Sequence, residues 1–436
     1  MGILLAVGLP LGRYFAQQHT HPLNATEEYV QSRTENDPIN IIVLVNHIVH
    51  DSLEAKASDI HIEPWENYSG VRTRVNGILS ELAILPLEYH EKICARIKVM
   101  ANLASHEKDV PQDGKASLEG EEYAGVQLRV SVFPTVRGEK IVMRIFDPRA
   151  RTFDMASLGF DAETLARYTG ILGKPNGLIL LTGPTGSGKT TAIYASLGYL
   201  LEKYQNTLSI ASVEDPVEQS LMWVNQSSLN PAREYTYIAA LRSLLRQDPN
   251  VIMIGEIRDV ETASIAVTAG MTGHLVISTL HSGSTSGVFA RMINMGLEPF
   301  LLASTIIGVI GIRLVRLNCQ YCLEPYTPED YALHHLEVAT SKEFVEEQLN
   351  NNRFLKGLGC EACHHTGFGG RGSVTELLPM SEAVRQAVLQ KRPTREIQER
   401  AAESGMRTLW DNALQRVLEG KTTLEEIMRK IAADVV

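Results

Sequence analysis

A glycine-rich segment that ends in lysine and threonine gives this chain its clearest chemical signal. It matches G-x-x-x-x-G-K-[ST], the pattern of a phosphate-binding loop. Its residues are Gly183, Pro184, Thr185, Gly186, Ser187, Gly188, Lys189, Thr190 and Thr191. The glycines let backbone N–H groups surround a phosphate at the positive end of the helix that follows. An apolar run at 178–182 and a predicted helix at 190–201 give the loop the strand–loop–helix context it requires.

Two side chains complete this predicted site. Lys189 is expected to reach the β- and γ-phosphates of ATP, and the Thr190 hydroxyl is expected to hold Mg²⁺. The loop predicts nucleotide binding, but it does not say how the energy of the nucleotide is used.

Carboxylates follow two other apolar runs. Glu214 and Asp215 end one run, and Glu256 and Asp259 follow the other. Because ligands of open α/β sheets collect at the carboxyl ends of the strands, these side chains are expected in one crevice, where an acid suits Mg²⁺ or the attacking water. The alternative is that they are ordinary solvated carboxylates.

Histidines flank a further apolar run at 275–278. His274 precedes this run and His281 follows it. A lone histidine at either position is more often structural, so position alone leaves a functional and a structural interpretation open for both.

Four of the five cysteines form two C-x-x-C pairs. The pairs are Cys319 with Cys322 and Cys360 with Cys363. This spacing predicts a structural Zn²⁺ site, because four thiolates leave no open coordination position. Disulfides are the competing interpretation, and the adjacent histidines at 364 and 365 are alternative ligands. The 37 residues between the pairs are expected to contain a helical insertion at 331–349, and the fifth cysteine, at 94, is expected in a core.

Two arginines stand out in a predicted pair of strands at 127–133 and 140–146. Arg129 alternates with apolar residues and is expected on a solvent or interface face. Arg144 lies in a run that is apolar on both faces, so a buried guanidinium that needs an anion is expected there. A carboxylate of the same fold and a phosphate at a subunit boundary are both candidates.

Elements of mixed type are expected to position these residues. The N-terminal region favours a helix at 39–57, a strand at 59–63 and a hairpin that turns at Asn76 and Gly77. Strands at 178–182, 208–213, 251–254 and 275–278 alternate with helices, which predicts a mostly parallel sheet. Short amphipathic helices are expected from 377 to 428.

Composition limits the classes of function. A chain of 436 residues is expected to form two or three domains, and its net charge of −10 argues against a non-specific nucleic-acid binder. The most apolar stretch, 299–312, is shorter than the roughly 20 residues of a membrane span. The apolar start at 1–11 lacks the pattern of a secretory signal. A cytoplasmic protein with at most peripheral membrane contact is therefore expected.

Taken together, these motifs resemble the type II secretion and type IV pilus ATPase family. The matching segments are 183–191 (Walker A), 214–218 (aspartate box), 252–259 (Walker B), 272–281 (histidine box), and 57–64 and 128–131 as signatures of the domain before the motor. The resemblance extends from about residue 38 to the C-terminus, and the order of the motifs makes it specific.

The resemblance implies an α/β fold in which a smaller PAS-like α+β domain precedes a RecA-like ATPase domain with a mostly parallel sheet. The implied divisions are an N-terminal arm (1–37), the PAS-like domain (38–148), a linker (149–162) and the ATPase domain (163–436), which includes a tetracysteine zinc element (317–366) and C-terminal helices (377–436).

The resemblance also implies roles for single residues. Arg129 and Arg144 match arginines of the preceding domain that approach a nucleotide held between the two domains, and Arg72 and Arg74 match with less defined roles. The histidine box implies that His274 and His281 contact the γ-phosphate or the metal shell. Glu214 is expected to activate water and Glu256 to join the Mg²⁺ shell, and the two assignments are open to exchange.

The implied function is that of a ring-shaped homohexamer that hydrolyses ATP with Mg²⁺. It would power assembly of type IV pilus or type II secretion pseudopilus fibres through an inner-membrane platform protein, from the cytoplasmic side. The tetracysteine element resembles the assembly branch more than the retraction motors. The alternatives are a pilus-retraction, conjugative or DNA-uptake motor of the same family, a nucleic-acid translocase, and a nucleotide-binding scaffold whose zinc element is the working part.

Overall fold

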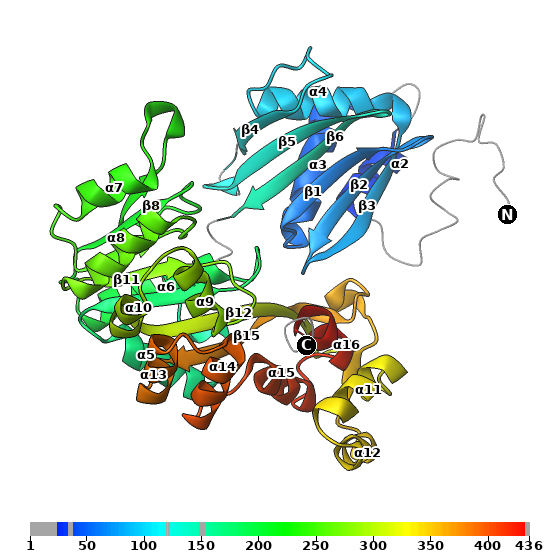
Figure 1. Ribbon diagram of the computed structural model, residues 1–436. Helices are drawn as coiled ribbons and strands as arrows, with labels where there is room; N and C mark the ends of the chain where they lie inside the picture. Colours follow the sequence, from blue (N-terminus) through cyan, green and yellow to red (C-terminus); the bar gives the residue numbers. More distant parts are fainter. Residues whose placement is uncertain (1–23, 34–37, 119, 121–122, 148–152, 432–436) are drawn as a thin grey trace. The chain divides into compact units, whose positions relative to one another are not determined.

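The computed structural model, drawn in Figure 1, describes residues 24–33, 38–118, 120, 123–147 and 153–431. The chain divides into two compact units, Met1–Arg151 and Thr152–Val436. Most of the predicted N-terminal arm, including the apolar start at 1–11, and residues 149–152 of the predicted linker lie outside the described residues.

The first unit is a six-stranded antiparallel sheet with helices packed on one face. The strand order is β3-β2-β1-β6-β5-β4. Its elements are α2 (Ala25–Gln31), α3 (Ile41–Glu54), β1 (Asp59–Pro64), β2 (Tyr68–Val75), β3 (Ile78–Pro86), the 3₁₀ turn η1 (Leu87–Tyr89), α4 (His90–Met100), β4 (Gln112–Ser117), β5 (Gln127–Thr135) and β6 (Gly138–Phe146).

Alternation of apolar and polar residues explains which face of this sheet is covered. Leu128, Val130 and Val132 of β5 are buried together with residues of α3 and α4, whereas Arg129 points to the opposite face. The predicted hairpin is also confirmed, because Asn76 and Gly77 join β2 to β3 with φ angles of 51° and 81°.

The second unit is built on a seven-stranded sheet, ordered β15-β12-β7-β11-β10-β8-β9. All neighbours are parallel except β12 and β15, so the mostly parallel sheet is confirmed. The strands are β7 (Gly177–Thr182), β8 (Ile210–Glu214), β9 (Asn225–Ser228), β10 (Val251–Ile254), β11 (Leu275–Thr279), β12 (Ile306–Asn318) and β15 (Phe368–Pro379).

Helices cover both faces of this sheet (Figure 1). Leu178 and Leu180 of β7 face one helix layer, and Ile179 and Leu181 face the other, so β7 is apolar on both sides. One layer holds η4 (Ala156–Leu158), α5 (Ala162–Leu172) and α6 (Lys189–Lys203). The other holds α7 (Tyr237–Leu244), α8 (Val260–Met271), α9 (Gly287–Asn294), α10 (Pro299–Thr305), α13 (Glu382–Leu389) and α14 (Thr394–Glu403).

A separate hydrophobic core forms where the insertion with the cysteine pairs meets the last helices. It joins β12 and β15 to α11 (Asp330–Ala339), α12 (Lys342–Asn350), α15 (Leu409–Leu418) and α16 (Leu424–Ile431). We call this part the C-terminal lobe. Its further elements are β13 (Leu323–Pro325), β14 (Leu355–Gly357) and η6 (Glu361–Cys363). Outside this lobe, the short 3₁₀ helix η5 (Pro231–Arg233) follows β9.

The apolar stretch at 299–312 contains the helix α10 and the start of the long strand β12. Two sequence expectations are corrected in detail by the structure. Residues 377–379 end strand β15, so the short helices begin only at Glu382. The insertion contains two helices, because Ser341 caps α12 by accepting a hydrogen bond from the Phe344 N–H (3.2 Å). No helix in the described part of the chain is long and apolar enough to cross a bilayer.

Candidate active site

The phosphate-binding loop lies at the carboxyl end of β7, where α6 begins. All six residues of β7 are buried, and Gly188 precedes α6 with a left-handed φ of 94°. Gly183 has a φ of 151°, and a Cβ there would collide with the backbone oxygen of Ile312. The loop therefore needs glycine at both positions, and its N–H groups lie at the positive end of α6, as an anion site requires.

The Lys189 ammonium lies against the loop itself. It donates hydrogen bonds to the carbonyl oxygens of Gly183 (2.8 Å) and Pro184 (2.9 Å). Burial lowers the pKa of Lys189, and the nearby Arg313 guanidinium lowers it further, whereas Glu256 and Glu218 oppose the shift. An additional negative charge at the loop would be stabilised by these two cations.

Glu256 and His281 come from neighbouring strand ends and face each other. Glu256 follows β10, His281 follows β11, and the Glu256 Oε2 to His281 Nε2 distance is 3.8 Å. Arg258 donates a short hydrogen bond to the Glu256 carboxylate. This bond is the main reason why the pKa of Glu256 lies below its usual value, and His281 and Lys189 add to the effect. Glu256 is thus an ionised carboxylate near the Lys189 ammonium.

Hydrogen bonds fix the strand ends that carry this group. The Thr279 hydroxyl donates to the Gly255 carbonyl (2.8 Å), which joins β11 to β10. The Thr182 hydroxyl donates to the Ser282 carbonyl (2.9 Å) and accepts from the Ser282 N–H (3.1 Å), which joins the end of β7 to the segment after β11. The loop, Glu256 and His281 therefore share one sheet edge.

Glu214 lies in different surroundings from Glu256. It is only 3% exposed at the end of β8. Its carboxylate accepts hydrogen bonds from the Tyr194 hydroxyl (2.5 Å), the Ser212 hydroxyl (2.6 Å) and the Gln226 amide (3.1 Å). Burial and this carboxylate raise the pKa of Tyr194 well above its usual value. Both Glu214 oxygens accept hydrogen bonds from protein donors, and its expected role in activating water stays a prediction.

The other carboxylates of the two motifs have separate contacts. Glu218 lies 3.5 Å from the Thr190 hydroxyl, measured from Oε1 to Oγ1. Asp215 lies 3.7 Å from the Arg258 guanidinium. Asp259 caps α8 by accepting a hydrogen bond from the Thr262 N–H (2.7 Å), so its role in the structure is to begin that helix.

The structure does not bring His274 to this sheet edge. His274 precedes β11, so the strand Leu275–Thr279 separates it from His281 by roughly 17 Å, at about 3.3 Å per residue. Its Nδ1 lies 3.1 Å from the Ala269 carbonyl of α8. Of the two histidines expected at one site, His281 is the one that lies there.

The arginines of the first unit lie on the sheet face opposite the helices. The expectation of a buried Arg144 is wrong: its side chain is 65% exposed, and its Nε donates to Asp59 (3.0 Å). The anion is thus a carboxylate of the same sheet. Arg129 stacks over the Phe146 ring, with the guanidinium carbon 4.4 Å from the ring centre. Arg129 and Arg144 are cross-strand partners in β5 and β6.

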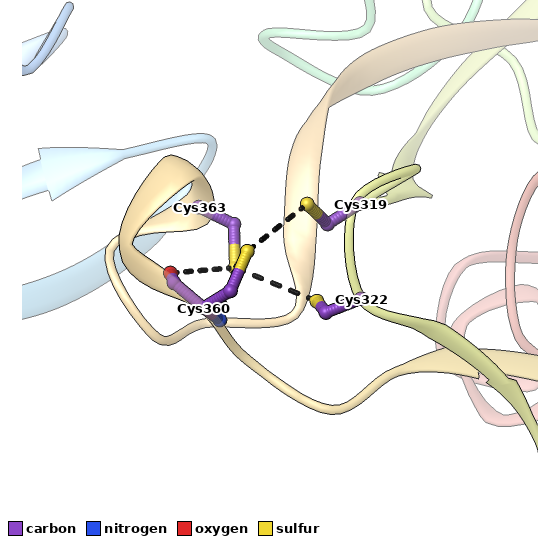
Figure 2. A group of neighbouring side chains, drawn as sticks. All are labelled: Cys319, Cys322, Cys360 and Cys363. Atoms are coloured by element: carbon purple, nitrogen blue, oxygen red, sulfur yellow. Dashed lines mark hydrogen bonds between the residues drawn. The ribbon is translucent and has the colours of Figure 1, made fainter.

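The four cysteines of the two pairs converge in the C-terminal lobe (Figure 2). Their sulfur atoms lie within 4.8 Å of one another. Three Sγ–Sγ distances, from Cys319 to Cys360, from Cys322 to Cys363 and from Cys360 to Cys363, are 3.8, 3.9 and 3.8 Å. A tetrahedral site with Zn–S bonds of about 2.3 Å has edges of about 3.8 Å, so the donor set fits Zn²⁺. The metal-compatible group in the described residues consists of these four thiols and includes neither His364 nor His365.

Backbone N–H groups surround these sulfurs as well. Gly359 donates to the Cys322 sulfur (3.2 Å), and Cys360 and Gly367 donate to the Cys363 sulfur (3.1 and 3.3 Å). Such donors favour thiolates, the form in which cysteine binds metals. Cys94, by contrast, lies on α4 and is buried in the core of the first unit, as expected.

Arg313, which lies beside the phosphate-binding loop, is a residue of this site that the sequence motifs do not include. It is 5% exposed on β12, and it donates to the carbonyls of Ile312 (3.1 Å) and Gly283 (2.8 Å). An arginine in an otherwise apolar run was the available signal.

The fold and this site define a P-loop ATPase of the RecA-like class. The family model for "Type II/IV secretion system protein" matches residues 34–429, and the chain belongs to this family. That match covers both units and every motif described above.

Curated relatives support the same assignment. The chain is 40% identical to the type II secretion system protein HxcR of Pseudomonas aeruginosa, over 90% of this chain and 78% of that protein. It is 38% identical to the type IV pilus assembly ATPase PilB of Myxococcus xanthus (93% and 72%) and 38% identical to the type II secretion system ATPase E of Vibrio cholerae (97% and 80%).

Solved structures share the fold at lower identity. The Legionella pneumophila ATPase DotB superposes with a TM-score of 0.65 at 18% identity, over 90% of this chain and 95% of that one. The pilus retraction motor PilT with bound ADP gives a TM-score of 0.57 at 24% identity (88% and 95%). At these identities the likeness concerns the fold alone.

Proposed function

We propose that this chain works as a homohexamer that hydrolyses ATP with Mg²⁺ and powers assembly of a type IV pilus or a type II secretion pseudopilus. Its partner would be an inner-membrane platform protein, which it would meet from the cytoplasmic side. The observation that carries the proposal is the shared sheet edge, where Lys189, Glu256 and His281 surround the phosphate-binding loop.

The relatives support an assembly motor. The three relatives described above, each matched over more than 70% of its own length, are named as type II secretion proteins or as a pilus assembly ATPase. Because both names occur at nearly equal identity, the proposal includes both kinds of fibre. The retraction motor PilT contributes only its fold, so no observation favours retraction.

In this proposal the loop glycines and Lys189 bind the phosphates of ATP. The Thr190 hydroxyl would hold Mg²⁺, and Glu218, 3.5 Å from that hydroxyl, would add negative charge beside it. Mg²⁺ would neutralise charge that develops on the phosphates. Glu256 would help to hold Mg²⁺ or would orient the attacking water, since its carboxylate is ionised and lies near Lys189.

Other residues receive revised roles. We propose that His281 contacts the γ-phosphate, because it lies beside Glu256. His274 would instead help α8 to pack against β11, because its ring lies against the Ala269 carbonyl of α8. We assign Glu214 to holding Tyr194 and Gln226 in place. The family resemblance is the basis for one further role: Arg129 and Arg144, on the sheet face opposite the helices, would supply positive charge to the nucleotide phosphates.

The cysteine cluster is proposed to hold one structural Zn²⁺. With four thiolate ligands, no position would remain for a substrate or water. Zinc would join the two ends of the insertion at 317–366 and so fix α11 and α12 against the last helices.

A genetic experiment tests the biological part of this proposal. Deletion of the gene should abolish surface pili, secretion of exported proteins, or both, and the wild-type gene should restore the lost function. A gene that carries Lys189→Ala should not restore it. Full restoration by Lys189→Ala would contradict the proposal, because the function would then not need the phosphate-binding loop.

A further inference from the structure

A buried carboxylate connects the segment beside the phosphate-binding loop to the C-terminal lobe. The segment at 281–286 follows β11 and leads into α9. Glu376 of β15, which is 4% exposed, accepts a short hydrogen bond from the Thr285 hydroxyl of this segment. Its second oxygen accepts a hydrogen bond from the backbone N–H of Leu409 (2.9 Å), the first residue of α15. One side chain thus holds two elements far apart in the sequence.

The segment at 281–286 also contacts the nucleotide site directly. It begins with His281, which faces Glu256, and Ser282 shares two hydrogen bonds with Thr182 at the end of β7. Arg313, under the loop, donates to the Gly283 carbonyl (2.8 Å). A displacement at the phosphates would therefore reach Thr285 through four residues of backbone.

On the other side, α15 belongs to the core of the lobe with the cysteine cluster. Leu409, Ala413 and Val417 of α15 pack in the same core as Leu336 of α11 and Phe354, both within the insertion. A buried carboxylate at the first turn of a helix is stabilised by the N–H groups exposed there. Movement of Glu376 would therefore move α15 and, with it, the lobe.

We propose that Glu376 is a positioning residue that couples the segment at 281–286 to helix α15, so that the nucleotide state of the loop changes the C-terminal lobe. This inference rests on the proposed ATPase function. It assigns no contact between Glu376 and the nucleotide.

The test compares two nucleotide states in the purified full chain. Hydrogen–deuterium exchange at 408–412 is measured with Mg-ADP and with Mg and a non-hydrolysable ATP analogue, and kcat and KM for ATP are measured in parallel. The wild type should show a difference in exchange between the two states. Thr285→Val, which removes only the hydroxyl, should abolish that difference and lower kcat about 5- to 10-fold with KM within about twofold, the effect of one lost buried hydrogen bond.

Two variants of Glu376 separate coupling from bulk packing. Glu376→Gln retains an oxygen for the Leu409 N–H and an amide that can donate to the Thr285 hydroxyl, so it should keep the exchange difference. Glu376→Leu should lose the difference. Should the leucine variant fail to fold, the comparison of Thr285→Val with Glu376→Gln still decides the result.

Asn412 provides a matched control on the same helix. Its side-chain amide donates to the Thr375 carbonyl (2.7 Å), which holds α15 on β15 without involving the segment at 281–286. Asn412→Ala should keep the exchange difference. An equal loss in Asn412→Ala and Thr285→Val, a wild type without any difference, or a Thr285→Val chain that retains it would each overturn the coupling. A wild type that does not bind or hydrolyse ATP would instead refute the proposed function.

Discussion

At the scale of single residues, two glutamates that follow parallel strands differ in what surrounds them. Glu256 lies beside Arg258 and His281, whereas Glu214 is enclosed by three protein donors. Sequence could place both at the same sheet edge, since both follow buried strands. It could not distinguish them, because Tyr194 and Gln226 reach Glu214 from a helix and a strand elsewhere in the chain.

A matched pair of substitutions separates these two glutamates. Glu256→Gln should lower kcat for ATP by about 100-fold or more, because the charge that serves the metal or the water is lost, while the melting temperature stays unchanged. Glu214→Gln should cost less than about tenfold, since the amide oxygen can still accept from Ser212 and Gln226 while the amide nitrogen donates to the Tyr194 hydroxyl oxygen. Steady-state kinetics and thermal unfolding of both variants provide the measurement. Glu214→Gln with wild-type stability and no turnover would restore Glu214 as the base.

At the scale of elements, the sequence predicts the four central strands of the parallel sheet but not the long strands β12 and β15. The strands β7, β8, β10 and β11 are short apolar runs, each with a motif at its carboxyl end, and their predicted positions are confirmed. The long pair β12 and β15 was missed. An apolar stretch such as 299–312 suits a buried helix as well as a strand, and pairing between residues about 60 positions apart leaves no local signal.

The cysteine cluster makes a prediction about metal content. The purified chain, prepared without chelators, should contain about one zinc per chain. Cys363→Ser should lower the zinc content and the melting temperature, because the metal would no longer hold the two ends of the insertion together. Elemental analysis and thermal unfolding measure both effects. Cys94→Ser is the control, since Cys94 lies in the other unit and should leave zinc unchanged. A wild type without zinc or another bound metal would contradict the assignment.

The ion pair that attaches α16 to β12 is expected to make the stability of the fold depend on pH. Burial opposes ionisation of Glu426, but hydrogen bonds from Arg316 and Arg429 outweigh it and hold the pKa of Glu426 below its usual value. A lowered pKa in the folded state contributes stability above the ordinary pKa of a glutamate, and that stability is lost as the pH falls through the folded value.

Glu426→Gln should therefore lower the free energy of unfolding by about 1–3 kcal/mol at pH 7 and by less near pH 3. Denaturant titrations at the two pH values measure the difference. Glu425→Gln is a neighbouring control, because Glu425 instead accepts hydrogen bonds from Tyr326 and from the Glu329 N–H. An equal loss at both pH values for Glu426→Gln would show that ionisation is not the cause.

At the scale of the whole molecule, the chain combines an antiparallel unit with a mostly parallel one. The fold class and the family were predictable because the motifs occur in order along the sequence, each after its own strand. The connection from the segment at 281–286 through Glu376 to α15 was not predictable. It depends on β15, whose position only the folded sheet reveals.

The central claim is that ATP binds at the loop around Lys189 and is hydrolysed there. The most direct measurement is the ATPase rate of the purified full chain with Mg²⁺, alone, with DNA, and with the cytoplasmic domain of its platform protein. The account predicts turnover that rises with the platform domain, does not respond to DNA, and is lost in Lys189→Ala but kept in Lys203→Ala, a lysine at the other end of α6. No hydrolysis under any of these conditions, or equal rates in the wild type and Lys189→Ala, would contradict it.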